Sequence, residues 1–541
     1  MEKRIHRFSL LKNLLHSAML SLCLMGLLVG NACKKETPTP EKEKAPTQTK
    51  ERSEPVKKNV LRSQLAEMGW YPSDPNALDR QIEDLFRQAQ VKPIDNVVGL
   101  ILPHAGYAYS GRTAAAGLKT TSKTYKRFIV IGATHRLGME EILSVPRATH
   151  YQTPLGQVPL DVELIDKLLE YSIFCHVPQA HEYNRGGQEH CVQIELPLLQ
   201  HRQKDFTFVP IVAGQCSPET VDKAAAILKN LVDEETLVIA SSDFVHYGPN
   251  YGYVPFKENI QEQIKKLDMG AYDLIAQLDG RGFLEYRRNT GATICGSVPI
   301  AVLLSMLSES TESHLIQYAT SGEMTGDFTN SVSYLSVAFS GTWGVPSQVE
   351  PDANNAALTE QDKEQLLTLA RKTIVYALEK RRVPEASDLD ITPSAAMQSP
   401  RAAFVTLKKH AQLRGCIGDI FPQRPLYKSV ILNAIHACVN DRRFRPVTQD
   451  ECNEITIDIS ALTPPAPVDS PDKIRIGIDG VVLNKDGHSA VFLPQVAPEQ
   501  GWNLEQTLTH LSEKAQLPAD AWKKGASFLV FQADVFGESE K

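Results

Sequence analysis

The chain has 541 residues, of which 42% are hydrophobic and 22% charged, and its formal net charge is -7. At about 100–200 residues per domain this length predicts two to four folded domains, and the composition is ordinary for a globular protein with a large core. A negative net charge does not attract the phosphate backbone of nucleic acid, so nucleic acid is not an expected partner. The nine cysteines include no CxxC pair, which argues against a zinc ribbon or a thioredoxin motif.

The N-terminus has the pattern of a targeting segment. Four basic residues within the first twelve positions precede the apolar stretch 14–29, which is short for a membrane span. Small residues at positions 30 and 32 then precede Cys33. We expect residues 1–32 to be a signal peptide and the protein to be exported to the cell envelope, with lipid on Cys33 as its membrane anchor. Cleavage without lipidation is the alternative, because position 30 is Gly where a lipobox usually has Leu.

Residues 33–59 are poor in apolar side chains and predict a disordered tether, since they cannot offset the entropy of ordering. An α/β domain is expected over residues 60–344. Continuous apolar runs predict strands buried on both faces of a mostly parallel or mixed sheet, and amphipathic stretches predict helices between them. The predicted strands are 97–102, 128–131 and 237–240, and the predicted helices include 162–171 and 218–232.

A second domain is expected after a linker. Residues 345–357 are rich in Pro, Asn and Ala, which is typical of a connection between domains. The remaining chain, 358–541, has a mixed pattern that indicates an α+β fold. Its predicted elements are helices over 360–380 and 428–439 and strands over 404–407 and 455–459.

Polar residues follow the apolar runs of the first domain. His104 lies in PHAGYAYSG after the first run, His135 in GATH after the second, and Asp243 and His246 in SSDFVHYG after the third. Ligands of open α/β sheets bind beyond the carboxyl ends of the strands. A single such histidine is more often structural, but three strand ends of this kind in one domain indicate a site.

Cys295, in NTGATICG, precedes an apolar helix expected to begin near Val298. A thiol near a helix N-terminus is more easily ionised, and thiolate with imidazole suits iron, copper or zinc. A disulfide is the structural alternative in an exported protein.

Five segments resemble the Memo family, in order and at similar spacing: PHAGYAYSG, GATH, GGQEHCVQIELP, SSDFVHYG and NTGATICG. The resemblance covers about residues 60–340 and implies a fold similar to class III extradiol dioxygenases, which hold a non-haem iron. It implies His104, His135 and Cys295 as metal ligands, and we expect iron or copper as the metal. It implies Asp243 and His246 as further pocket residues, and His190 as the histidine of the family's Glu-His motif.

The sequence departs from the Memo pattern at two places. The family usually has a histidine shortly before a Gly-x-Trp-Tyr-like motif, but residues 64–71 read QLAEMGWY and contain none. Arg136 stands where relatives often have a second histidine. This chain therefore has neither of the two histidines at these positions.

The second domain resembles the AMMECR family over about residues 358–541, and LRGCIG is that family's signature. Arg414, Gly415, Cys416 and Gly418 carry the match, as a signature loop in which the glycines allow a tight turn and close backbone approach. The chain thus resembles a fusion of proteins B and A of the AmmeMemoRadiSam system, which implies a radical S-adenosylmethionine protein as a possible partner. The CxxxCxxC motif of that partner is absent here.

Three functions follow from these patterns. The leading one is a metal-dependent redox or oxygenase-like protein, in which Asp243 and His246 handle protons and His190 is a further residue of the pocket. The second is a non-catalytic protein that binds a small molecule, a peptide or a partner. The third is an extradiol dioxygenase, although Cys295 in place of a carboxylate ligand argues against it.

Overall fold

The computed structural model describes residues 58–182, 189–346, 349 and 357–539. The predicted signal peptide, Cys33, nearly all of the tether and most of the predicted linker lie outside these residues. Among the described residues, no helix combines the length and the apolar character that crossing a membrane requires.

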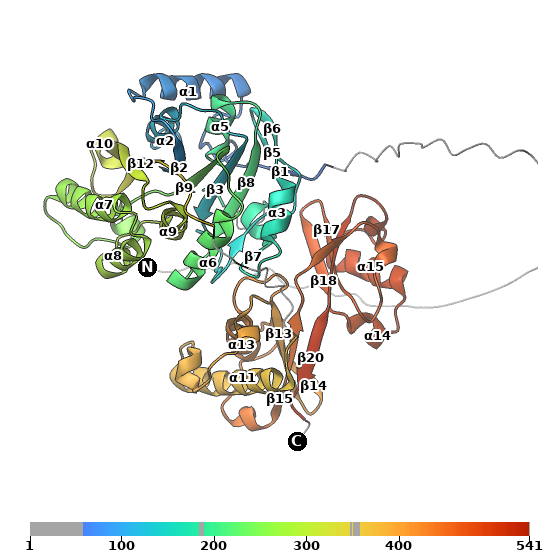
Figure 1. Ribbon diagram of the computed structural model, residues 1–541. Coiled ribbons are helices and arrows are strands. Elements are labelled where there is room, and N and C mark those ends of the chain that lie inside the picture. Colours follow the sequence, from blue (N-terminus) through green and yellow to red (C-terminus); the bar gives the residue numbers. More distant parts are fainter. Residues whose placement is uncertain (1–57, 183–188, 347–348, 350–356, 540–541) are drawn as a thin grey trace, which may run out of the picture. The chain divides into compact units, whose positions relative to one another are not determined.

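A nine-stranded mixed sheet forms the centre of the first domain (Figure 1). Its order is β10-β12-β2-β9-β3-β8-β4-β7, and β11 pairs with β12 outside this path. Strands β2, β9, β3 and β8 run parallel to one another, while β12 is antiparallel to β2 and β4 is antiparallel to β8. The mixed sheet predicted from the apolar runs is therefore confirmed. The strands are β2 (Val97–Leu102), β3 (Arg127–Ala133), β4 (Leu143–Ser144), β7 (Phe174–Cys175), β8 (Thr207–Ala213), β9 (Thr236–Ser241), β10 (His246–Tyr247), β11 (Glu312–Thr320) and β12 (Ser331–Ser340).

Helices cover both faces of this sheet. On β2, a Cβ at Gly99 would meet Leu303 of α9 (Ser297–Met306), whereas Leu102 lies against Gly117 of α2 (Gly111–Lys119). Residues three apart in a strand point to opposite faces, so α9 and α2 pack on opposite sides. The strands between them are fully buried, which explains why they read as continuous apolar runs. The other helices are α1 (Pro75–Gln88), α3 (Val162–Leu168), α4 (Pro178–His181), α5 (Leu196–Arg202), α6 (Pro218–Lys229), α7 (Ile260–Ala276), α8 (Gly280–Thr290) and α10 (Ser321–Thr325).

Two predicted helices end earlier than their apolar pattern suggests. Helix α3 ends at Leu168 rather than near 171, and α6 ends at Lys229 rather than 232. In both, the following backbone N–H groups bond in tighter turns, such as Leu231 to the carbonyl of Leu228. The apolar side chains beyond each end still pack on the core, which is why they extended the predicted pattern.

The second domain contains two four-stranded sheets, as expected for an α+β fold. One has the order β14-β13-β15-β20, with helices α11 and α13 packed together beside it; the other has the order β16-β19-β17-β18, with α15 against β18. The predicted helix over 428–439 is divided: α13 is followed by a π-helical turn at His436–Asn440. The elements are α11 (Glu360–Lys380), β13 (Ala403–Lys409), β14 (Gln412–Gly418), α13 (Leu426–Ile435), β15 (Ile455–Leu462), β16 (Ala466–Val468), β17 (Gly480–Lys485), β18 (His488–Phe492), α15 (Leu504–Lys514), β19 (Ser527–Phe531) and β20 (Ala533–Gly537).

Asp268 on α7 is a fully buried carboxyl that supports the loop after β9. Its Oδ1 accepts from the Val245 N–H at 3.1 Å, and the Tyr318 hydroxyl donates to its Oδ2 at 3.0 Å. Burial raises the pKa of Asp268 to about 7, from 3.8. The folded protein therefore binds a proton that the unfolded chain releases, and stability from this group falls as the pH rises from about 4 to 7.

We expect Asp268→Asn to stabilise the protein at pH 8 by about 2 kcal/mol and to have little effect at pH 4. The asparagine needs no ionisation, but its neutral hydrogen bonds are weaker than those of a carboxylate, which reduces the gain. Urea unfolding of both proteins across this pH range measures the difference. A stability difference that does not rise with pH would contradict the buried carboxyl as its source.

Candidate metal centre

The three predicted strand ends meet at one edge of the sheet. Strands β2, β9 and β3 are adjacent and parallel, so their carboxyl ends lie together. His104 follows β2, His135 follows β3, and Asp243 follows β9. The backbone N–H of His104 donates to Asp243 Oδ1 at 2.8 Å, which joins two of these ends directly.

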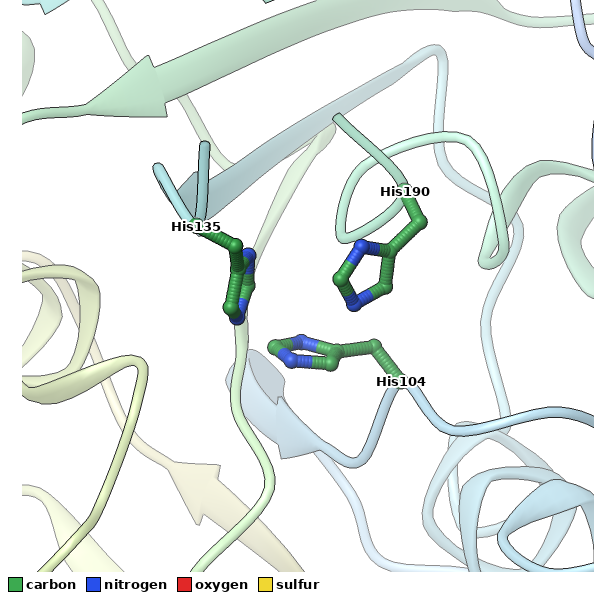
Figure 2. A group of neighbouring side chains, drawn as sticks. All are labelled: His104, His135 and His190. Atoms are coloured by element: carbon green, nitrogen blue, oxygen red, sulfur yellow. The ribbon is translucent and has the colours of Figure 1, made fainter. Parts of the chain in front are cut away.

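Three histidines form a cluster at this edge (Figure 2). The ring centroids of His135 and His190 are 4.4 Å apart, and His104 lies 5.2 Å from His135 and 5.1 Å from His190. One nitrogen from each ring lies within 4.8 Å of the others, a spacing that could hold a metal ion. Imidazole nitrogens suit zinc, copper, iron and nickel, so this donor set fits a transition metal but does not select among them.

The structure places Cys295 beside His104, one member of the cluster; the three residues grouped as possible metal ligands are His104, His135 and His190. The Sγ of Cys295 lies 3.2 Å from His104 Nε2 and 3.5 Å from the carbonyl oxygen of Asp243. As predicted, the residue directly precedes a helix, α9, which begins at Ser297. Cys295 is a free thiol in this structure and does not form the disulfide that was the alternative interpretation of this residue.

His246 is tied to the segment that carries Cys295. Its backbone N–H donates to Thr293 Oγ1 at 2.9 Å, and its Nδ1 lies 2.8 Å from the carbonyl oxygen of Thr293. Because a carbonyl can only accept, Nδ1 carries the proton and Nε2 is the basic nitrogen. The ring packs edge-on to Tyr251, with centroids 5.3 Å apart.

The imidazoles of the cluster differ in basicity. Burial, with the neighbouring rings of His190 and His135, lowers the pKa of His104 well below its usual range. Burial and His135 also lower the pKa of His190, to about 3. Two of the three rings are therefore neutral near pH 7, which is the form that binds metal.

His135 titrates in the opposite direction. Burial alone would lower its pKa, but hydrogen bonds with Cys191, Cys295 and Glu189 outweigh burial and raise the pKa above its usual value. The Glu189 carboxylate lies 3.4 Å from His135 Nδ1. A metal ion that binds here must therefore displace a proton from His135.

Glu189 is a site residue that the sequence reasoning missed. The buried carboxylate accepts from the backbone N–H groups of His135 and Arg136 at 2.8–3.0 Å and from the Thr134 hydroxyl at 2.9 Å. It thereby holds the GATH turn in place. The available signal was its position beside His190 in the Glu-His motif.

The segment without the family's expected histidine also reaches the cluster. Trp70 packs on His190 with ring centroids 4.7 Å apart, and its carbonyl oxygen accepts from the Tyr107 N–H. The backbone N–H of Gln64 donates to the side chain of Gln193 at 3.3 Å. Residues 64–71 thus contribute the indole ring of Trp70 to the surroundings of the cluster, where the family usually has an imidazole.

The signature residues of the second domain lie in strand β14 rather than in the predicted loop. The prediction was wrong because β14 pairs in antiparallel register with β13, and the left-handed turn falls earlier, at His410 and Ala411. The predicted close approach is present: a Cβ on Gly415 would lie 2.2 Å from the carbonyl oxygen of Ala437. At Gly418, a Cβ would lie 2.2 Å from the ring of Phe404.

Arg414 and Cys416 are held by neighbours within the second domain. The guanidinium of Arg414 pairs with Glu451 at 3.0 Å and donates to the carbonyl oxygen of Arg445 at 2.9 Å. The backbone N–H of Cys416 donates to Asp441 Oδ2 at 2.9 Å, and the Thr406 hydroxyl donates to its sulfur at 3.2 Å. These contacts give the motif a structural role.

The first domain is thus an α/β protein with a histidine cluster and a thiol at the carboxyl edge of its sheet. Residues 65–338 match the family model described as Memo-like protein, and residues 367–536 match the model described as AMMECR1. The chain belongs to the Memo-like family and carries an AMMECR1 domain after the Memo domain.

Each of the following relatives matches part of this chain. A MEMO1 family protein of Thermococcus onnurineus is 30% identical over 50% of this chain and 96% of its own length. One from Methanobrevibacter smithii is 32% identical over 52% of this chain and 100% of its own. A Methanosarcina barkeri protein is 36% identical over 34% of this chain and 93% of its own. A solved structure of an uncharacterized Pyrococcus horikoshii protein is 33% identical, covering 34% of this chain and 94% of its own, with a TM-score of 0.32.

Proposed function

We propose that the Memo domain is a metal-dependent redox or oxygenase-like protein that holds iron or copper at His104, His135 and Cys295. The observation that carries this proposal is the contact between the Cys295 thiol and His104, one of three clustered imidazoles. Nitrogen donors alone select poorly among divalent metals, and a thiolate favours softer, redox-active ions. His190 adds a third nitrogen to the same cluster.

The bound metal would supply Lewis acidity or electron transfer, and the protein would supply proton handling around it. We assign this role to His246, whose Nε2 is the basic nitrogen, and to Asp243, whose pKa is raised by burial. His190, neutral and packed under Trp70, would orient a bound molecule or complete the metal shell. The substrate is proposed only by class, as a small molecule or a peptide.

The test of the metal site is Cys295→Ser, compared with Cys216→Ser in protein purified without oxygen. Cys216 lies in the same domain, and its sulfur contacts the carbonyl oxygens of Ile142 and Gly214, where a serine hydroxyl can donate instead. We expect Cys295→Ser to lose iron or copper and the thiolate-to-metal charge-transfer band, and Cys216→Ser to keep both. Full metal content and an unchanged spectrum in Cys295→Ser would remove sulfur from the site.

Two other functions have distinct signatures. A non-catalytic binding protein, in which the AMMECR1 domain acts as a partner module, would contain no stoichiometric redox metal. An extradiol dioxygenase would consume oxygen with catechols. A radical S-adenosylmethionine protein remains the proposed partner class, through the resemblance to the AmmeMemoRadiSam fusion.

We also propose that the protein is exported and anchored through lipid on Cys33. The support is the basic start, the short apolar stretch and the small residues before Cys33. Mass spectrometry of the membrane fraction is expected to find acylated Cys33 as the mature N-terminus. Unmodified Cys33 in the soluble fraction would contradict the anchor.

A further inference from the structure

The two nitrogens of His104 have different partners: Nε2 faces Cys295, and Nδ1 contacts a buried polar group. His104 Nδ1 lies 3.0 Å from Ser241 Oγ. That hydroxyl oxygen also lies 2.7 Å from the carbonyl oxygen of Cys191 and 3.0 Å from Glu195 Oε1. His104, Ser241 and Glu195 are each at most 1% exposed, so bulk solvent does not reach these bonds.

The protons of this group can be assigned from its donors and acceptors. A serine hydroxyl has one proton and two lone pairs. The Cys191 carbonyl oxygen can only accept, and at 2.7 Å it makes the shortest of the three contacts, so Ser241 donates to it. The other two partners must then donate to Ser241 Oγ. His104 therefore carries its proton on Nδ1, and its Nε2 lone pair faces Cys295 Sγ at 3.2 Å.

We propose that Ser241 and Glu195 form a buried relay that positions His104, with Nδ1 held as a donor and the Nε2 lone pair left free to face Cys295. Neither residue touches the cluster itself except through His104. Both are positioning residues rather than catalytic ones. Glu195 comes from the same segment as His190, and Ser241 ends strand β9, so the relay joins the parts of the chain that build the site.

The relay requires a neutral Glu195. Its Oε2 is buried and has no hydrogen-bond partner among the described residues, so an anionic carboxylate would be poorly compensated there. Burial raises the pKa of Glu195 to about 8; the Ser241 bond opposes this rise, and the nearby Asp243 carboxyl reinforces it. Neutral Glu195 can donate to Ser241 while Ser241 donates to Cys191.

The relay has a consequence for metal binding, and this part of the inference rests on the proposed metal site. Groups that orient a histidine ligand from behind typically contribute about 10- to 100-fold to metal affinity. Without an acceptor at Ser241, the proton of His104 can move to Nε2, where it blocks the lone pair. Metal binding would then require the proton to return to Nδ1, and the free energy of that step would weaken the measured affinity.

The first test needs no metal. In the full chain with ring-15N-labelled histidine, wild-type His104 is expected to show the Nδ1–H tautomer, and Ser241→Ala is expected to give a mixture. Ser144→Ala is the matched control, because buried Ser144 lies 3.0 Å from Nε2 of buried His181. It should change the His181 signal and leave His104 unchanged. A wild-type His104 protonated on Nε2, or a tautomer unaffected by Ser241→Ala, would overturn the relay.

The second test is titration of the metal-free proteins with Co²⁺. Ser241→Ala and Glu195→Leu are expected to bind about 10- to 100-fold more weakly than wild type. Glu195→Gln, whose amide can also donate to Ser241, should bind within about threefold. If Glu195→Gln loses as much affinity as Glu195→Leu, the proposal that a neutral Glu195 donates a hydrogen bond to Ser241 is wrong. If wild type binds no Co²⁺ while His104 keeps the expected tautomer, the proposed metal function fails and the relay stands.

Discussion

Replacing His135 with alanine is expected to weaken transition-metal binding by about 100-fold or more. Mutating a residue that only hydrogen-bonds to a metal ligand already lowers metal affinity by about 10- to 100-fold, and His135 would be a ligand itself. His135 provides one of the three clustered nitrogens and is the most exposed of the three rings. Its removal should therefore leave the fold intact. The GATH turn keeps its bonds to Glu189, since these are made by backbone N–H groups and Thr134.

The measurement is competitive titration with Co²⁺ or Zn²⁺, together with thermal unfolding of the metal-free protein. His201→Ala is the control, because His201 lies in the same domain and pairs with Asp79 and Glu83 at the surface. It should bind metal like wild type. Equal affinity in His135→Ala and His201→Ala would show that the cluster is not the metal site.

Replacing Gly415 with alanine should destabilise the second domain by about 3 kcal/mol, the upper part of the usual range for overpacking. The added Cβ would lie 2.2 Å from the carbonyl oxygen of Ala437, and a backbone atom in the π-helical turn after α13 cannot rotate away as a side chain can. Strand β14 and this turn must therefore separate.

Leu413→Ala is the matched control on the same strand, because Leu413 is 45% exposed and its truncation should cost little stability. Urea unfolding followed by hydrogen exchange in peptides from β13 and β14 separates the two variants, with β2 of the first domain as an internal reference. Exchange in Gly415→Ala that matches Leu413→Ala would show that the strand tolerates the extra carbon.

Much of the metal centre could be predicted from the sequence. His104, His135 and Asp243 each follow an apolar run, and parallel strands bring such ends together whatever the loops contain. Cys295 was identified by the helix expected after it, and that helix is present. The resemblance to the Memo family grouped these residues into one metal site, which the periodicity of apolar residues alone could not do.

The supporting residues could not be predicted in the same way. Glu189, Glu195 and Ser241 act through hydrogen bonds across the sheet edge, over sequence separations that no local pattern records. Trp70 contacts His190 although the two residues are 120 positions apart in the sequence. Their roles depend on distance and burial, which arise only when the chain is folded.

The sequence by itself predicted the three central strands of the first domain, the α/β and α+β classes of the two domains, and the residue types near the strand ends. Apolar periodicity is a local property, because each strand or helix must bury its own face. Tertiary structure decided that the signature of the second domain is a strand and that His190 joins His104 and His135. It also decided which nitrogen of His104 is free. Those outcomes depend on packing and desolvation, since a hydrogen bond or a pKa is set by neighbours that are distant in the chain.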